Sequence, residues 1–298
     1  MVAVAALLGV CVGCSENEKA PSGAANEGPF KSLEVAANAP SAFSSPRAGV
    51  PLSDGGIVFI ATLEEGLLPA DREIGERIAI LRRETPTSEV EVLYSGELLL
   101  NPLDIAISVD EKTLYIADPA GGSEGGGAVF TLPIAGGEPA EALSGYAPRA
   151  VSVSESDAVY FSGKAPDTGE VGVFSLAAGA ATPLFVGAPL VDPSGIAVQR
   201  DGSVLVADTR AFDADPALSN EASIVRIAGG RATTLASGFA TGYPAGIALT
   251  RDESTLIVSG EGPESQRHGV LGRHERPQRR TASRHRQLFE LSPTRRRA

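Results

Sequence analysis

The chain has 298 residues, of which 43% are apolar, and its formal net charge is −12. This apolar content suffices for one large core or two small ones and excludes disorder as the main state. The 34 glycines and 21 prolines are spread along the chain, as an all-β protein with many turns requires. The acidic balance gives no electrostatic reason to expect nucleic acid as a partner.

The first segment, residues 1–14, is a short apolar stretch of secretory-signal length that ends in Cys11-Val12-Gly13-Cys14. This ending resembles a bacterial lipobox, in which a small residue precedes the cysteine that receives the lipid. The resemblance implies an exported protein anchored through Cys14 to the outer membrane or cell surface, with no other membrane contact. A cleaved or misassigned signal and a buried N-terminal strand are the alternatives.

Residues 15–45 are rich in Ala, Ser, Pro, Asn and Glu, a composition typical of a tether. Within this linker, Phe30 to Val35 alternates apolar and polar side chains. This alternation predicts one strand, which is placed to close a ring formed by the rest of the chain.

A sequence repeat occupies residues 46–266. Its copies begin at Pro46, Pro102, Pro148, Pro193 and Pro244. In four of the five copies an aspartate follows the proline by eight positions: Asp54, Asp110, Asp201 and Asp252. A repeat of about 45 to 50 residues is the sequence signature of an array of similar structural units.

The repeat unit predicts four short strands, although the fifth copy lacks a recognisable third and fourth strand. In the second copy, Ile105 to Val109 alternates, a turn at Asp110 follows, and residues 114–116 form a fully apolar run. A third strand is predicted at residues 128–132 and an outer one at 142–143. Four strands per unit is the content of a propeller blade, so the sequence predicts an all-β propeller with five recognisable blades. The absence of helical periodicity argues against a βαβ fold.

The segment PSGIAVQRDGSVLVAD, which begins at Pro193, resembles the repeat of the NHL family and, more broadly, the gluconolactonase-like six-bladed propellers. The resemblance implies a complete architecture of six blades. Propellers of this kind include binding platforms, lyases and lactonases, so it implies no single function.

The lactonases among them bind a divalent metal at the mouth of the central channel through Glu, Asn and Asp side chains. At the matching positions this chain has Leu103, Ser194 and Ala245, none of which replaces such a ligand. Asn101 and Asp104 lie nearby and supply at most part of a site. The resemblance therefore implies no metal and no other cofactor here, with calcium as the runner-up.

General acid and base chemistry by histidine is not expected in the repeat, because all three histidines lie after Gln266. Two aspartates, Asp118 and Asp208, end equivalent second strands where the chain leaves for a loop. They either contribute to a ligand site or accept hydrogen bonds from loop amides, as aspartates in turns commonly do.

The residues expected at the channel mouth are Asp104, Asp118, Arg149, Ser194 and Asp208. The function predicted is a non-catalytic module that binds a small molecule, a glycan or a protein. The alternatives are a metal-dependent hydrolase or lyase of the lactonase type, and a scaffold whose outer sheet edges pair with a partner.

The last stretch, residues 267–298, differs in character from the rest. It holds ten arginines, two glutamates and no lysine, a net charge of +8, whereas residues 1–266 carry −20. This composition predicts a tail outside the propeller. It is typical of a shifted reading frame in GC-rich DNA, and the alternatives are a disordered tail and a basic interaction arm.

Overall fold

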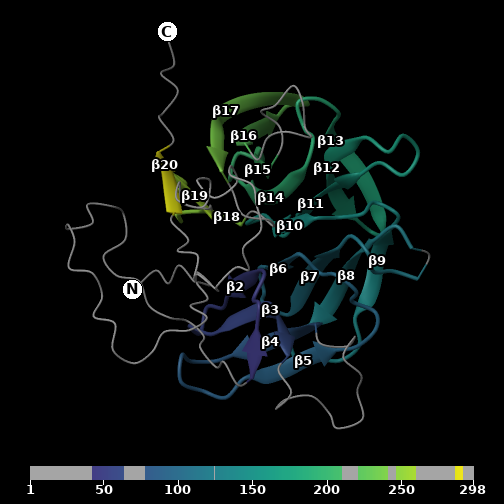
Figure 1. Cartoon of the computed structure of the whole chain (residues 1–298), viewed down its shortest axis with the longest axis vertical. Helices are drawn as coiled ribbons and strands as arrows, with labels where there is room; N and C mark the ends of the chain where they lie inside the picture. The colour runs from purple at the N-terminus through teal and green to yellow at the C-terminus, as the bar shows by residue number, and fades with distance from the viewer. Residues whose placement is uncertain are drawn as a thin grey trace, which may run out of the picture.

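The computed structural model describes residues 42–63, 78–123, 125–209, 221–240, 246–259 and 286–290. Regular structure in these ranges is entirely β, in five antiparallel sheets arranged around a common centre (Figure 1). Within the same ranges, no helix is long and apolar enough to cross a membrane.

The first two repeat copies form sheets 1 and 2. Sheet 1 contains β1 (Phe43–Ser44), β2 (Gly49–Pro51), β3 (Ile57–Leu63), β4 (Ile78–Arg83) and β5 (Glu91–Ser95). Both β1 and β2 pair with β3, so the inner edge of this sheet is one strand in two pieces. Sheet 2 contains β6 (Asp104–Ile107), β7 (Thr113–Asp118), β8 (Ala128–Pro133) and β9 (Ala140–Ser144).

The other copies form sheets 3, 4 and 5. Sheet 3 contains β10 (Ala150–Val153), β11 (Val159–Lys164), β12 (Val171–Ala177) and β13 (Ala180–Val186). Sheet 4 contains β14 (Pro193–Val198), β15 (Val204–Asp208), β16 (Glu221–Ala228) and β17 (Arg231–Ala240). Sheet 5 contains β18 (Ile247–Leu249), β19 (Thr255–Ser259) and β20 (Arg286–Glu290).

The sheets confirm the predicted fold class. Sheets 2, 3 and 4 each have four strands in simple antiparallel order. The first strand of each copy is the innermost, and the strands β2, β6, β10, β14 and β18 contact one another in that sequence. The chain therefore forms a β-propeller array in which one repeat copy makes one blade.

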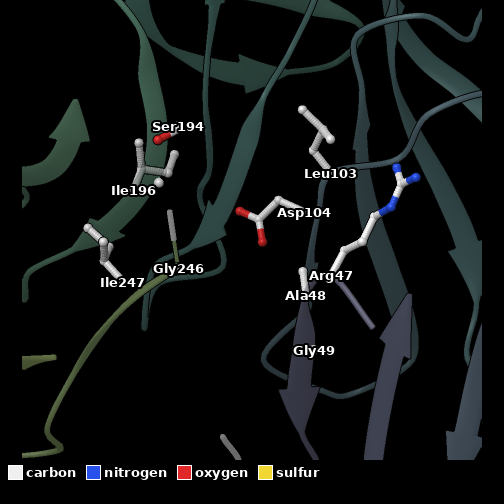
Figure 2. A pocket seen from close by; sticks show the side chains of 10 residues that line it. Arg47, Ala48, Gly49, Leu103, Asp104, Ser194, Ile196, Gly246 and Ile247 are labelled. Atoms are coloured by element: carbon white, nitrogen blue, oxygen red, sulfur yellow. The ribbon is translucent and has the colours of Figure 1, made fainter. Parts of the chain in front are cut away.

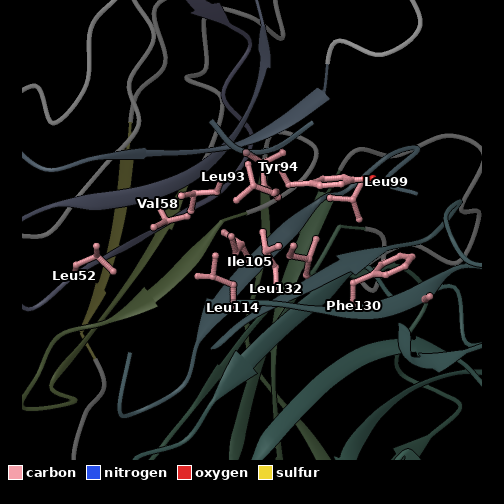
Figure 3. Close-up of a cluster of buried hydrophobic side chains, with 13 residues drawn as sticks. Leu52, Val58, Leu93, Tyr94, Leu99, Ile105, Leu114, Phe130 and Leu132 are labelled. Atoms are coloured by element: carbon pink, nitrogen blue, oxygen red, sulfur yellow. The ribbon is translucent and has the colours of Figure 1, made fainter. Parts of the chain in front are cut away.

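The second strand of a copy is apolar on both faces because it lies between two neighbouring sheets. In β7, Leu114 and Ile116 pack toward sheet 1, whereas Ala117 packs toward sheet 3. Figure 3 shows the cluster between sheets 1 and 2, which includes Val58 and Phe130. Each large apolar side chain buried in this way contributes about 1.5 to 3 kcal/mol, so packing between blades stabilises the fold.

The repeated aspartate shapes the turn that joins the first two strands. Asp54 accepts a hydrogen bond from the N–H of Gly56 at 2.8 Å, and Asp201 accepts one from Ser203 at 2.9 Å. The next residue has a positive φ in every copy, from 56° to 94°: Gly55, Glu111, Asp157, Gly202 and Glu253. The aspartate therefore stabilises a turn with one left-handed residue, which is a structural role.

In sheets 2, 3 and 5, an acidic side chain at this left-handed position also links the sheet to the one before it. Each accepts a hydrogen bond, at 2.8 Å, from a backbone N–H of the preceding turn: Glu111 from Ser53, Asp157 from Val109, and Glu253 from Arg200. We call these bonds the inter-sheet clasps. Sheet 4 has Gly202 at this position, and an ion pair between Arg200 and Glu155 at 2.8 Å spans that junction instead.

Two predicted segments, residues 1–14 and the strand at Phe30 to Val35, lie outside the described residues. The stretch 267–298 was predicted to lie outside the propeller, but the structure places five of its residues in sheet 5. These residues form β20, which pairs with β19 so that Leu256 is opposite Phe289. The third strand of this sheet is therefore more distant in the sequence than in the other copies.

Candidate ligand-binding site

A small cavity lies at the centre of the array, among the first residues of the inner strands. Its volume is about 110 Å³, and residues of sheets 1, 2, 4 and 5 line it. The polar side chains among them belong to Arg47, Asp104 and Ser194. A space of this size admits the head group of a ligand rather than a whole drug-sized molecule, for which pockets are about 300 to 1,000 Å³.

The repeat explains why the cavity exists and why it carries one acidic side chain. Two positions after each proline the copies have Ala48, Asp104, Ala150, Gly195 and Gly246. Four of these residues are small, which leaves the centre open. Figure 2 shows the carboxylate of Asp104 directed into the space between these strands.

The environment of Asp104 shifts its protonation. Its Oδ1 accepts a hydrogen bond from the N–H of Ile105, and its Oδ2 accepts one from the N–H of Val151 on sheet 3, both at 3.0 Å. These bonds favour the ionised form, but desolvation outweighs them and raises the pKa of Asp104 from 3.8 to about 7. The carboxyl group therefore changes its charge near neutral pH.

Ser194, on β14 of sheet 4, lines the same cavity as Asp104 and is 3% exposed. Its Oγ donates to the carbonyl oxygen of Ala207 at 3.4 Å. A hydroxyl that uses its hydrogen in this way still has acceptor capacity on its oxygen. The structure thus brings two of the predicted site residues, Asp104 and Ser194, into one cavity.

Arg149 was predicted at the channel mouth, and it is not among the residues that line the cavity. It forms an ion pair with Asp192, the residue just before the inner strand of sheet 4. Arg47 occupies the same position in sheet 1 and donates to the carbonyl oxygen of Pro102 at 3.2 Å and to the side chain of Asn101. Both arginines therefore tie one sheet to the start of the next. In Figure 2, the guanidinium of Arg47 points away from the carboxylate of Asp104.

Asp118 and Asp208 are fully buried, and neither borders the cavity. Asp118 accepts backbone hydrogen bonds at 2.7 to 3.1 Å from four residues: Leu100, Asn101, Ala120 and Gly121. Asp208 accepts equivalent bonds from Val191 at 2.8 Å and Asp192 at 2.9 Å. This geometry supports the alternative in which the two carboxylates organise loops.

The described residues contain no group of three or more His, Cys, Asp or Glu side chains that could hold a metal ion. Of the three positions that match lactonase ligands, Leu103 and Ser194 line the cavity, and Ala245 lies outside the described residues. A single carboxylate falls short of the six to eight oxygen ligands that calcium takes.

No protein-family model and no curated protein matches this sequence. Similar solved structures include TolB from Acinetobacter baumannii, with a TM-score of 0.52 and 14% identity, over 78% of this chain and 52% of that one. An oligogalacturonate lyase from Vibrio parahaemolyticus has a TM-score of 0.49 and 12% identity, over 76% and 65% of the two chains. A gluconolactonase from Xanthomonas campestris has a TM-score of 0.49 and 17% identity, over 72% of this chain and 69% of that one.

Of these three, the likeness to TolB has a TM-score above 0.5, and at 14% identity it supports the fold and nothing finer. This chain spans about half the length of the TolB chain that it resembles. The fold alone therefore specifies neither the family nor the activity.

Proposed function

We propose that the chain is an exported, lipid-anchored propeller of the NHL type that binds a small ligand at its central cavity without catalysing a reaction on it. One observation carries the proposal: within the described residues, the cavity has a single acidic side chain, Asp104, and that side chain points inward. The export part rests on the Gly13-Cys14 junction after an apolar run.

The other carboxylates described above have structural roles and lie away from the cavity. This supports Asp104 as the carboxylate that meets a ligand. The turn aspartates, the inter-sheet clasps, Asp118 and Asp208 all bind backbone amides. Asp104 also accepts two amide bonds, but it alone among these carboxylates borders the cavity.

The test is a thermal-shift screen of small molecules against the mature chain and two variants. Ala48→Leu fills the cavity, whereas Ala180→Leu adds the same volume at an exposed position of β13 and serves as the control. We expect ligands that raise the melting temperature of the original chain and of Ala180→Leu but leave that of Ala48→Leu unchanged. Ligands that stabilise all three proteins equally would place the site elsewhere.

A hydrolase or lyase of the lactonase type is the second candidate, favoured by one observation. With a pKa of about 7, Asp104 is suited to act as a general base at neutral pH. Incubating the screened ligands and simple aldonolactones with the protein and with Asp104→Asn, followed by mass spectrometry, separates the candidates. Turnover that Asp104→Asn abolishes would favour the enzyme.

A further inference from the structure

We propose that the central cavity recognises a primary ammonium group, which binds to Asp104 and Ser194. This inference rests on the proposed function and adds the chemical class of the ligand.

The charge around the cavity selects a cation. Asp104 directs a carboxylate into the cavity, while the guanidinium of Arg47, the basic group in the lining, is turned toward Asn101 and Pro102. Residues 1–266 carry a net charge of −20, which raises the local concentration of cations around the propeller. An anionic ligand would meet repulsion both in solution and in the cavity.

The hydrogen-bonding groups select a donor. Each oxygen of Asp104 accepts one amide bond, from Ile105 or Val151, and a carboxylate oxygen can accept a second. The Oγ of Ser194 uses its hydrogen toward Ala207, so its oxygen is an acceptor for a ligand. An ammonium group has three N–H donors and no acceptor, which complements these groups.

The size and lining of the cavity limit the organic group that is attached to the ammonium nitrogen. The walls are formed by glycines and by the apolar side chains of Leu103, Ile196 and Ile247, around about 110 Å³. This space suits an ammonium group on a short alkyl stem. A divalent metal ion is disfavoured because it needs several more oxygen ligands than the described residues place there.

The protonation of Asp104 adds a pH dependence to this recognition. An ammonium ion binds the ionised carboxylate, and at pH values below about 7 Asp104 is increasingly protonated in the free protein. We therefore expect the affinity to fall as the pH is lowered below 7, and binding near neutral pH to release protons.

The experiment is calorimetric titration of the mature chain with ethylammonium chloride, with ethanol as the neutral ligand of similar shape. Asp104→Asn removes the charge and keeps the size, Ala48→Leu closes the cavity and keeps the carboxylate, and Glu138→Gln removes an exposed charge as the control. Far-UV circular dichroism verifies that each variant is folded.

We expect the original chain and Glu138→Gln to bind ethylammonium and not ethanol. Both cavity variants should bind it roughly tenfold or more weakly, since a charge-assisted hydrogen bond or the space itself is lost. Affinity should also fall between pH 8 and pH 6. Equal binding by Asp104→Asn, or equal binding of ethanol, would overturn the inference.

Two further outcomes separate this inference from the proposed function. If ethylammonium does not bind but uncharged compounds stabilise the original chain and not Ala48→Leu, the ammonium inference fails and the cavity remains a ligand site. If neither class of compound distinguishes Ala48→Leu from Ala180→Leu, both fail. Stoichiometric binding of calcium chloride that Asp104→Asn abolishes would also overturn the ammonium inference, in favour of a metal site.

Discussion

The aspartates of the repeat divide into two kinds according to what their carboxylates contact. Asp118 and Asp208 are buried at the ends of β7 and β15, away from the cavity, and accept hydrogen bonds from the amides of the adjoining loops. Asp104 accepts two such bonds and also borders a cavity. Changes at the first kind should affect stability, whereas a change at the second should affect both ligand binding and the pH dependence of stability.

We expect Asp118→Ala to lower the free energy of unfolding by about 3 kcal/mol or more, because it leaves four backbone amides, of which that of Gly121 is buried, without their acceptor. Urea denaturation measures the loss. Glu138→Ala, at an exposed position, is the control and should change stability by less than about 0.5 kcal/mol. If the two variants unfold at the same urea concentration, the loop amides do not depend on this carboxylate.

The raised pKa of Asp104 predicts a specific pH dependence. Between its ordinary value of 3.8 and about 7, the folded protein keeps a proton on Asp104 that the unfolded chain has lost. Stability therefore falls, relative to Asp104→Asn, as the pH rises through this window, and the difference levels off above it. Melting temperatures of both proteins at a series of pH values measure this. A difference that stays constant from pH 4 to pH 8 would contradict it.

The sequence repeat predicted part of the site at this scale. Asp104 and Ser194 lie in one cavity because their positions in the repeat are adjacent and the inner strands converge. Arg47 was missed, although it occupies the repeat position of Arg149. Repeat position does not reveal where a long side chain turns, and both arginines reach the start of the next sheet.

At the scale of elements, the clasps explain how adjacent sheets keep their order. In three copies the left-handed residue of the turn between the first two strands has an acidic side chain, and its carboxylate accepts a hydrogen bond from an amide of the corresponding turn in the preceding sheet. Each clasp is a bond between one side chain and the backbone. The clasps lie where the inner strands end, whereas the cavity lies where these strands begin.

We expect Glu111→Ala to lower stability by about 1 kcal/mol, because it removes the acceptor of two bonds from Ser53, each 2.8 Å long.

Glu155→Gln should also be destabilising at low salt, through loss of the ion pair with Arg200, and should have little effect at about 1 M sodium chloride. Urea melts at both salt concentrations measure both effects. A loss from Glu155→Gln that is the same at both concentrations would mean that the ion pair is not its cause.

The strands that the sequence could not predict are those outside the repeat. The period of the repeat located the inner strands, because apolar residues alternate around a recognisable turn. It did not predict β1, which has only two residues, or β20, which lies in an Arg-rich stretch without that alternation. Both owe their place to pairing with a strand already formed, β3 or β19.

At the scale of the whole molecule, the proposal places the propeller outside the cytoplasm on a lipid anchor. Replacing Cys14 by Ser removes the thiol that is predicted to carry the lipid. We expect the variant to move from the membrane fraction to the soluble fraction and to lose the mass of the lipid. An unchanged fraction and an unchanged mass would contradict anchoring through Cys14.

The blades, the clasps and the small residues of the inner strands together produce one centre into which Asp104 points. A ¹³C NMR titration of the Asp104 carboxyl group, assigned by comparison with Asp104→Asn, tests for this central site. We expect a midpoint at about pH 7 in the free protein, which moves to lower pH when ethylammonium chloride is added. A midpoint near the ordinary value of 3.8, unaffected by ethylammonium, would show a solvated carboxylate and contradict the central cavity site.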